Sequence, residues 1–188
     1  MPTNPKQLVA DAKARMHQSV ETVLRELTTM RTGRASVSML DTIRVDYYGT
    51  PTPLKNLATI SAPEPRMLTI QPFDPTSIKS IEKTIQESDL GLTPSNDGKL
   101  IRLPIPQLTE ERRKELVKLT RNYAEEGRVA VRNVRRDVMR HLEELVRSGQ
   151  VGDDEERRAE GAVQKVTDDH VHKIDDLLKR KEAEIMEV

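Results

Sequence analysis

Residues 109–147 read TEERRKELVKLTRNYAEEGRVAVRNVRRDVMRHLEELVR. This stretch decides the fold because it predicts one long, uninterrupted helix, which contains no proline and is weakened only by Gly127. Its apolar side chains recur at steps of three and four residues, which places them on one side of a helix. The members of this apolar stripe are Leu116, Leu119, Tyr123, Ala130, Val134, Val138 and Leu145. A helix of this kind needs packing partners.

The same helix carries an arginine stripe, about 140° from the centre of the apolar stripe. Its members are Arg121, Arg128, Arg132 and Arg135. Residues 112–140 contain ten basic and four acidic side chains, and we interpret the stripe as an open cationic face with no carboxylate among its arginines. The alternative is an ordinary solvated face, but such faces usually mix opposite charges at positions i and i+4. A guanidinium group can donate two parallel hydrogen bonds to the oxygens of one phosphate, so the stripe predicts a polyanionic partner.

Two further helices are predicted to share a core with this one. The first spans residues 5–30, and its apolar positions are Leu8, Ala12, Met16, Val20, Val23, Leu27 and Met30. The other begins at Asp153, whose spacing to Glu156 fits a capping box. Its apolar positions are Val163, Val166, His170, Val171, Ile174, Leu177, Leu178 and Ile185. The sequence therefore predicts an elongated three-helix bundle.

The region between the first two helices has a different periodicity. Apolar and polar residues alternate over 42–47, as in a half-buried strand, and a glycine- and proline-rich break follows at 49–53. Further strands are expected near 57–60, 67–70 and 100–103. A short helix that starts after Asp74-Pro75 should bury Ile78, Ile81 and Ile85. We predict an α+β protein of two domains: a bundle of residues 1–30 and 107–188, and an inserted β/α/β domain of residues 31–106.

Two chain segments must connect the inserted domain to the bundle. One consists of Arg31, Thr32, Gly33 and Arg34, and the other of Pro104, Ile105 and Pro106. Few contacts are expected to cross at these segments. The sequence therefore predicts a hinge with two tethers, at which the angle between two rigid domains can change.

Composition argues against several classes of function. The chain has no cysteine, which excludes disulfides, thiol catalysis and thiolate metal sites. It has no apolar run of about 20 residues and no secretory signal, so a cytoplasmic protein is expected. The four histidines lack the spacing of a metal site, and neither a glycine-rich phosphate loop nor a G-x-S-x-G motif is present. We predict a binding protein that is not an enzyme and that uses no cofactor or metal.

Five motifs, in order along the chain, resemble those of the bacterial ribosome recycling factor family. They are RTGRAS at 31–36, DYYGTPTPL at 46–54, SDLGL at 88–92, LTEERR at 108–113 and RVAVRNVRRD at 128–137. The similarity continues to the KEAE sequence at 181–184. Several long motifs in the right order make a chance match implausible.

This resemblance implies an L-shaped, monomeric translation factor made of a three-helix bundle and a β/α/β domain. Such a factor binds the large ribosomal subunit after termination, with its arginine-bearing helix on ribosomal RNA. Together with elongation factor G and the GTP hydrolysis of that factor, it separates the subunits and frees messenger and transfer RNA. On this basis, the expected RNA-binding residues are Arg132 with its neighbours Arg121, Arg128, Arg135 and Arg136.

Two positions depart from the family pattern. Gln107 stands where a third proline is common, and Phe73 stands where tryptophan is frequent. We expect Gln107 to loosen the hinge and Phe73 to be neutral. The main alternative to an RNA-binding factor is a helical scaffold that binds protein partners through the same helix bundle. The salt dependence of binding distinguishes the two, because only RNA binding should weaken steeply with salt. A third possibility, a hydrolase that acts without another factor, is not supported by any motif in the sequence.

Overall fold

The computed structural model describes residues 4–187; residues 1–3 and 188, which the predicted bundle includes, lie outside that range. The described chain forms two compact units. We call residues 4–31 with 110–187 the bundle unit, and residues 32–109 the insert unit. The sequence placed these junctions one and three residues earlier, after residues 30 and 106.

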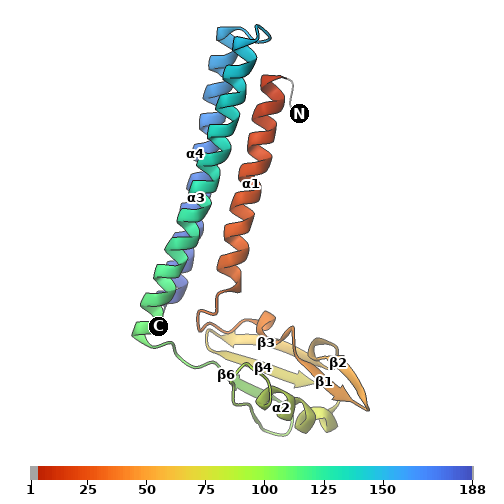
Figure 1. Ribbon diagram of the computed structural model, residues 1–188. Helices are drawn as coiled ribbons and strands as arrows, with labels where there is room; N and C mark the ends of the chain where they lie inside the picture. The colour runs from red at the N-terminus through yellow and green to blue at the C-terminus, as the bar shows by residue number, and fades with distance from the viewer. Residues whose placement is uncertain (1–3, 188) are drawn as a thin grey trace. The chain divides into compact units, whose positions relative to one another are not determined.

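The bundle unit consists of α1 (Pro5–Thr29), α3 (Glu110–Arg147) and α4 (Asp153–Met186), and each helix packs against the other two (Figure 1). The predicted long helix is confirmed, from Glu110 to Arg147. The predicted inner face of α1 is confirmed as well, since its buried residues are Pro5, Leu8, Ala12, Met16, Val20, Val23 and Leu27. No helix in the described range 4–187 has the length and apolar character needed to cross a bilayer.

The buried face of α3 differs from the predicted apolar stripe. The buried residues are Leu116, Thr120, Ala124, Gly127, Val131, Val134, Val138 and Leu142. Leu119 is 38% exposed, whereas Tyr123, Ala130 and Leu145 are only half-buried. At 100° per residue the true face is turned by about 50° toward the arginine stripe. The reason is that α3 packs against two helices, and small or polar residues that the apolar pattern omitted fill the centre of the contact.

Helix α4 starts where the sequence predicts but without the predicted cap. Its N-cap residue is Gly152, whose carbonyl accepts hydrogen bonds from the backbone N–H groups of Glu155 and Glu156, each at 3.0 Å. Asp153 is therefore the first helical residue, and the capping-box prediction is wrong. His170 is buried, and its Nδ1 lies 2.6 Å from the carbonyl oxygen of Val166. Within residues 4–187 no cluster of three or more acidic or histidine side chains could hold a metal ion.

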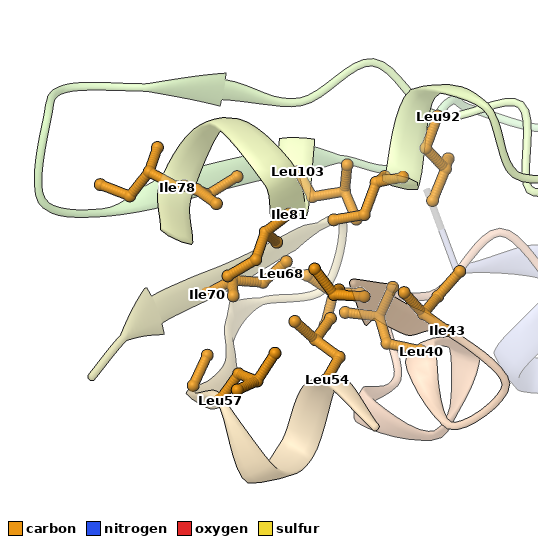
Figure 2. Packing of buried hydrophobic residues seen from close by; sticks show 14 of the residues in the cluster. Leu40, Ile43, Leu54, Leu57, Leu68, Ile70, Ile78, Ile81, Leu92 and Leu103 are labelled. Carbon is orange, nitrogen blue, oxygen red and sulfur yellow. The ribbon is translucent and has the colours of Figure 1, made fainter. Parts of the chain in front are cut away.

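The insert unit contains a four-stranded antiparallel sheet. Its strands are β3 (Ala58–Glu64), β4 (Met67–Pro72), β6 (Ile101–Pro104) and β5 (Ser95–Asn96), in that spatial order. Helix α2 (Ile78–Gln86) follows a 3₁₀ turn, η3 (Pro75–Ser77), and buries Ile78, Ile81 and Ile85 as predicted. Figure 2 shows Ile81 of α2 meeting Leu68 of β4 and Leu103 of β6 in the core of this unit.

A separate hairpin joins β1 (Arg44–Tyr47) to β2 (Thr50–Pro53). The break predicted at 49–53 is therefore wrong, because most of that segment is a strand. Tyr48 and Gly49 have φ angles of 50° and 82°, and two positive φ angles are what a tight two-residue hairpin turn requires. The prolines of β2 are tolerated because a strand in a two-stranded ribbon has a free edge. Two 3₁₀ turns, η1 (Val37–Leu40) and η2 (Leu54–Asn56), flank the hairpin.

Candidate nucleic-acid interface on helix α3

The five predicted RNA-binding arginines all lie on α3, but they are not equally accessible. Arg121, Arg132 and Arg136 are exposed, whereas Arg128 and Arg135 are half-buried. With the buried face in its observed position, the arginine stripe lies only about 90° from the centre of that face. The stripe therefore borders α4, and side chains of α4 can reach it.

The expectation of a cationic face without carboxylates is wrong. Arg121 Nε donates to Glu182 Oε1 of α4 at 2.6 Å. Arg132 Nη1 lies 3.3 Å from Glu125 Oε1 on its own helix. Glu125 could have been found from the sequence, because at 100° per residue it falls between Arg132 and Arg136 on the helical wheel. Glu182 could not, because its approach depends on how α3 and α4 pack.

Arg128 is the stripe arginine most firmly held within the bundle unit. Its Nε donates to Asp175 Oδ1 at 2.9 Å and its Nη1 to Glu125 Oε2 at 2.7 Å, and its side chain is only 19% exposed. Burial alone would lower the pKa of Arg128, but the hydrogen bonds to Glu125 and Asp175 outweigh burial and raise this pKa above its usual value. Arg128 therefore links α3 to α4 and is the least available of the five for an external partner.

Among the five arginines, Arg132, Arg135 and Arg136 are the most weakly paired with carboxylates, and they lie within five consecutive residues. The Arg132 side chain is 55% exposed, and Arg136 Nη2 donates to Asn133 Oδ1 at 2.9 Å. Arg135 lines a surface depression between α3 and α4, together with Gln164 and His172. Its Nε is buried and has no hydrogen-bond partner in the described chain. A buried N–H without a partner is rare in proteins and calls for an explanation.

The two connecting segments form a second group of predicted functional residues. Arg31 belongs to the bundle unit, whereas Thr32, Gly33, Arg34, Pro104, Ile105 and Pro106 belong to the insert unit. The backbone N–H of Ala35 donates to the carbonyl of Pro65 at 2.7 Å, and that of Ile105 donates to the carbonyl of Arg66 at 2.9 Å. Both segments are thus attached to the turn between β3 and β4.

Side chains reinforce this attachment. Gly33 has a φ of 76°, and a Cβ atom added there would lie 3.0 Å from Leu108 Cγ, so the first segment lies against Leu108, two residues after the second segment. With its amide oxygen turned toward the guanidinium, Gln107 accepts hydrogen bonds from Arg66 Nη1 and from Arg66 Nη2, the latter at 2.8 Å. Gln107 directly follows the second segment, and its side chain thus adds a contact to the turn between β3 and β4.

Comparison with known proteins agrees with the resemblance that the motifs indicate. The family model described as Ribosome recycling factor matches residues 23–186. The ribosome-recycling factor of Rubrobacter xylanophilus is 56% identical over 180 residues, which cover 96% of this chain and 97% of the relative. The Geobacillus kaustophilus factor is 54% identical over 183 residues, covering 97% of this chain and 99% of the relative.

Solved structures give the same result for the fold. A solution structure of a ribosome recycling factor is 41% identical, with a TM-score of 0.74 and full coverage of both chains. Models of the T. thermophilus ribosome recycling factor and the E. coli elongation factor G bound to the E. coli post-termination complex contain a chain that is 45% identical. The TM-score for that chain is 0.63, with 98% of this chain and 100% of the other covered. This chain belongs to the ribosome recycling factor family.

Proposed function

We propose that this chain binds the large ribosomal subunit after termination through the RNA contacts of its bundle unit. Together with elongation factor G, which hydrolyses GTP, it splits the ribosomal subunits and releases messenger and transfer RNA. Family membership supports this function, as does the related T. thermophilus factor bound with elongation factor G to a post-termination complex. In this role the chain is a monomeric binding factor that works beside ribosomes in the cytoplasm, without a cofactor or a catalytic site of its own.

The observation that carries the RNA contact is the cluster of Arg132, Arg135 and Arg136. Among the described residues, neither Arg135 nor Arg136 is paired with a carboxylate, and Arg132 has one long contact with Glu125. Guanidinium groups in this state can each form paired hydrogen bonds with phosphate oxygens. We assign Arg121 and Arg128 a lesser part in RNA binding, because carboxylates of α4 already hold them.

Arg132→Ala is expected to weaken binding to isolated large subunits about tenfold, because a charge-assisted contact to phosphate is lost. Each phosphate contact contributes roughly 0.7 to 0.9 to the slope of log affinity against log salt, so this slope should fall by about that amount. Sedimentation at several salt concentrations measures both quantities. Arg147→Ala is the matched control, since Arg147 is 81% exposed at the far end of α3. Binding that hardly responds to salt would instead favour the scaffold that binds proteins.

We also propose that the two connecting segments allow the units to change their relative angle. Because six of the seven predicted hinge residues are attached to the insert unit, we place the pivots at the unit boundaries, 31/32 and 109/110. The turn Pro65-Arg66 holds both segments within the insert unit, so movement is left to these two boundaries. This narrows the hinge from two flexible stretches to two short joints.

Arg66→Ala is expected to broaden the distribution of distances between the two units, because it removes the bonds to Gln107. Since the chain has no cysteine, spin labels can be attached through Lys13→Cys in the bundle unit and Lys99→Cys in the insert unit. Both lysines are exposed. Arg102→Ala is the control, because Arg102 pairs with Asp97 inside the insert unit. If the Arg66→Ala protein has a distance distribution as narrow as that of the wild type, Arg66 does not restrict the second connecting segment.

A further inference from the structure

Glu125 is the carboxylate that touches two arginines of the stripe. Its Oε2 lies 2.7 Å from Arg128 Nη1, and its Oε1 lies 3.3 Å from Arg132 Nη1. The Glu125 side chain is 53% exposed, so solvent and external ligands can reach it. The hydrogen bond from Arg128 is the main reason why the pKa of Glu125 lies below its usual value, and Glu125 is therefore a carboxylate near neutral pH.

The contact with Arg132 has a geometric consequence. Glu125 precedes Arg132 by seven residues, or about 10 Å along the helix axis. Arg132 must therefore extend toward the N-terminal end of α3 to reach this carboxylate, which directs its guanidinium away from the side of Arg135 and Arg136. A phosphate that binds Arg132 together with these two arginines must replace Glu125.

The two carboxylates of α4 that form ion pairs with the stripe act on different arginines. Asp175 bonds to Arg128, and Glu182 bonds to Arg121. Both arginines are those that we consider less available to RNA. Glu125 is thus placed to affect Arg132 directly, within the group of Arg132, Arg135 and Arg136.

We propose that Glu125 is an internal counter-ion and a positioning residue for Arg132, and that it competes with RNA phosphate for this guanidinium. When RNA binds, Arg132 exchanges its contact with a carboxylate for a contact with a phosphate. The net gain in binding free energy is therefore smaller than for an arginine without such a contact. Glu125 thereby limits affinity for ribosomal RNA and for other polyanions, which favours release after each round. This inference rests on the proposed function, because it requires Arg132 to bind phosphate.

The test compares Glu125→Gln with Glu126→Gln, which cause the same change in net charge at neighbouring positions. Glu126 is a suitable control because it lines the groove between α1 and α3, with Arg15 and Ser19, on another side of α3. We expect Glu125→Gln to bind isolated large subunits about three- to tenfold more tightly at low salt and to have a steeper salt slope. Glu126→Gln should change affinity less than twofold.

Two further variants separate a local effect of Glu125 from a general effect of charge. Glu125→Asp keeps the charge but shortens the side chain, so it should lose contact with Arg132 and also bind more tightly than the wild type. In an Arg132→Ala background, Glu125→Gln should change affinity less than twofold. A gain that persists without Arg132, or no gain relative to Glu126→Gln, would overturn the inference.

The same measurements distinguish this inference from the proposed function. If Arg132→Ala alone binds as tightly as the wild type, the proposed docking site and the inference are both wrong. If Arg132→Ala binds more weakly and neither Glu125 variant binds more tightly, only the inference is wrong. Circular dichroism spectra confirm in each case that the variant is folded.

Discussion

Gly127→Ala is expected to lower the free energy of unfolding of the bundle unit by about 2 kcal/mol. The change would normally stabilise a helix, since alanine is favoured over glycine in helix interiors by about 1 kcal/mol. At this position, however, the added Cβ would overlap Val23 Cγ2 of α1 and would lie 3.2 Å from Ile174 Cδ1 of α4. Overpacking of this kind costs about 1 to 3 kcal/mol. A β-branched valine on a helix has one strongly preferred rotamer, so Val23 cannot easily move aside.

Gly161→Ala is the matched control for this prediction. Gly161 lies within α4, and a Cβ atom added there would meet nothing within 4 Å. The same substitution should therefore stabilise the bundle unit by about 0.5 to 1 kcal/mol. Urea unfolding followed by the helical circular dichroism signal measures both changes. If both variants are more stable than the wild type, α3 does not approach α1 as closely as described.

Gly127 also shows which parts of the fold the sequence could predict. Both ends of α1 and α3 and the start of α4 follow from local signals such as Pro5 and the turn at 148–149, and these were predicted within one residue. The same local logic identified Gly127 only as a weak point of the helix. Its role as a point of close contact depends on two other helices, which periodicity in one segment cannot reveal.

The insert unit shows a similar limit. Alternation identified β1, and isoleucines at helical spacing identified α2. The second strand of the hairpin was missed, because Pro51 and Pro53 are poor strand residues by themselves. Their strand conformation depends on pairing with Asp46 and Arg44, across a tight turn at Tyr48-Gly49.

The sequence predicted which helix carries the candidate site, but it did not predict the acidic partners of its arginines. All five arginines lie on α3, as their spacing indicated, yet the acidic partners of Arg121 and Arg128 on α4 are about 50 to 60 residues away in sequence. Such pairs exist only after two helices have packed. The availability of each arginine is therefore a tertiary property, and on this basis we propose only the three arginines that are most weakly paired with carboxylates as the RNA contact.

Arg135→Met is expected to weaken binding to large subunits at least tenfold and, at the same time, to raise the free energy of unfolding of the bundle unit. The binding loss follows from removing one of the three guanidinium groups to which we assign the RNA contact. The gain in stability follows from the buried Nε of Arg135, which has no hydrogen-bond partner in the described chain. A buried donor without a partner costs about 1 to 3 kcal/mol, and methionine fills similar space without a donor. We expect an increase of about 1 kcal/mol.

Arg136→Met is the control for stability, because Arg136 is exposed and its substitution should change the free energy of unfolding by less than about 0.5 kcal/mol. Urea unfolding and subunit sedimentation of the same preparations measure the two effects. A stabilised protein that no longer binds would mean that Arg135 is retained for its partner at a cost to the fold. If both stability and binding are lost, Arg135 instead supports the fold of the bundle unit. The loss of binding would then be an indirect effect, with the phosphate contacts made by Arg132 and Arg136.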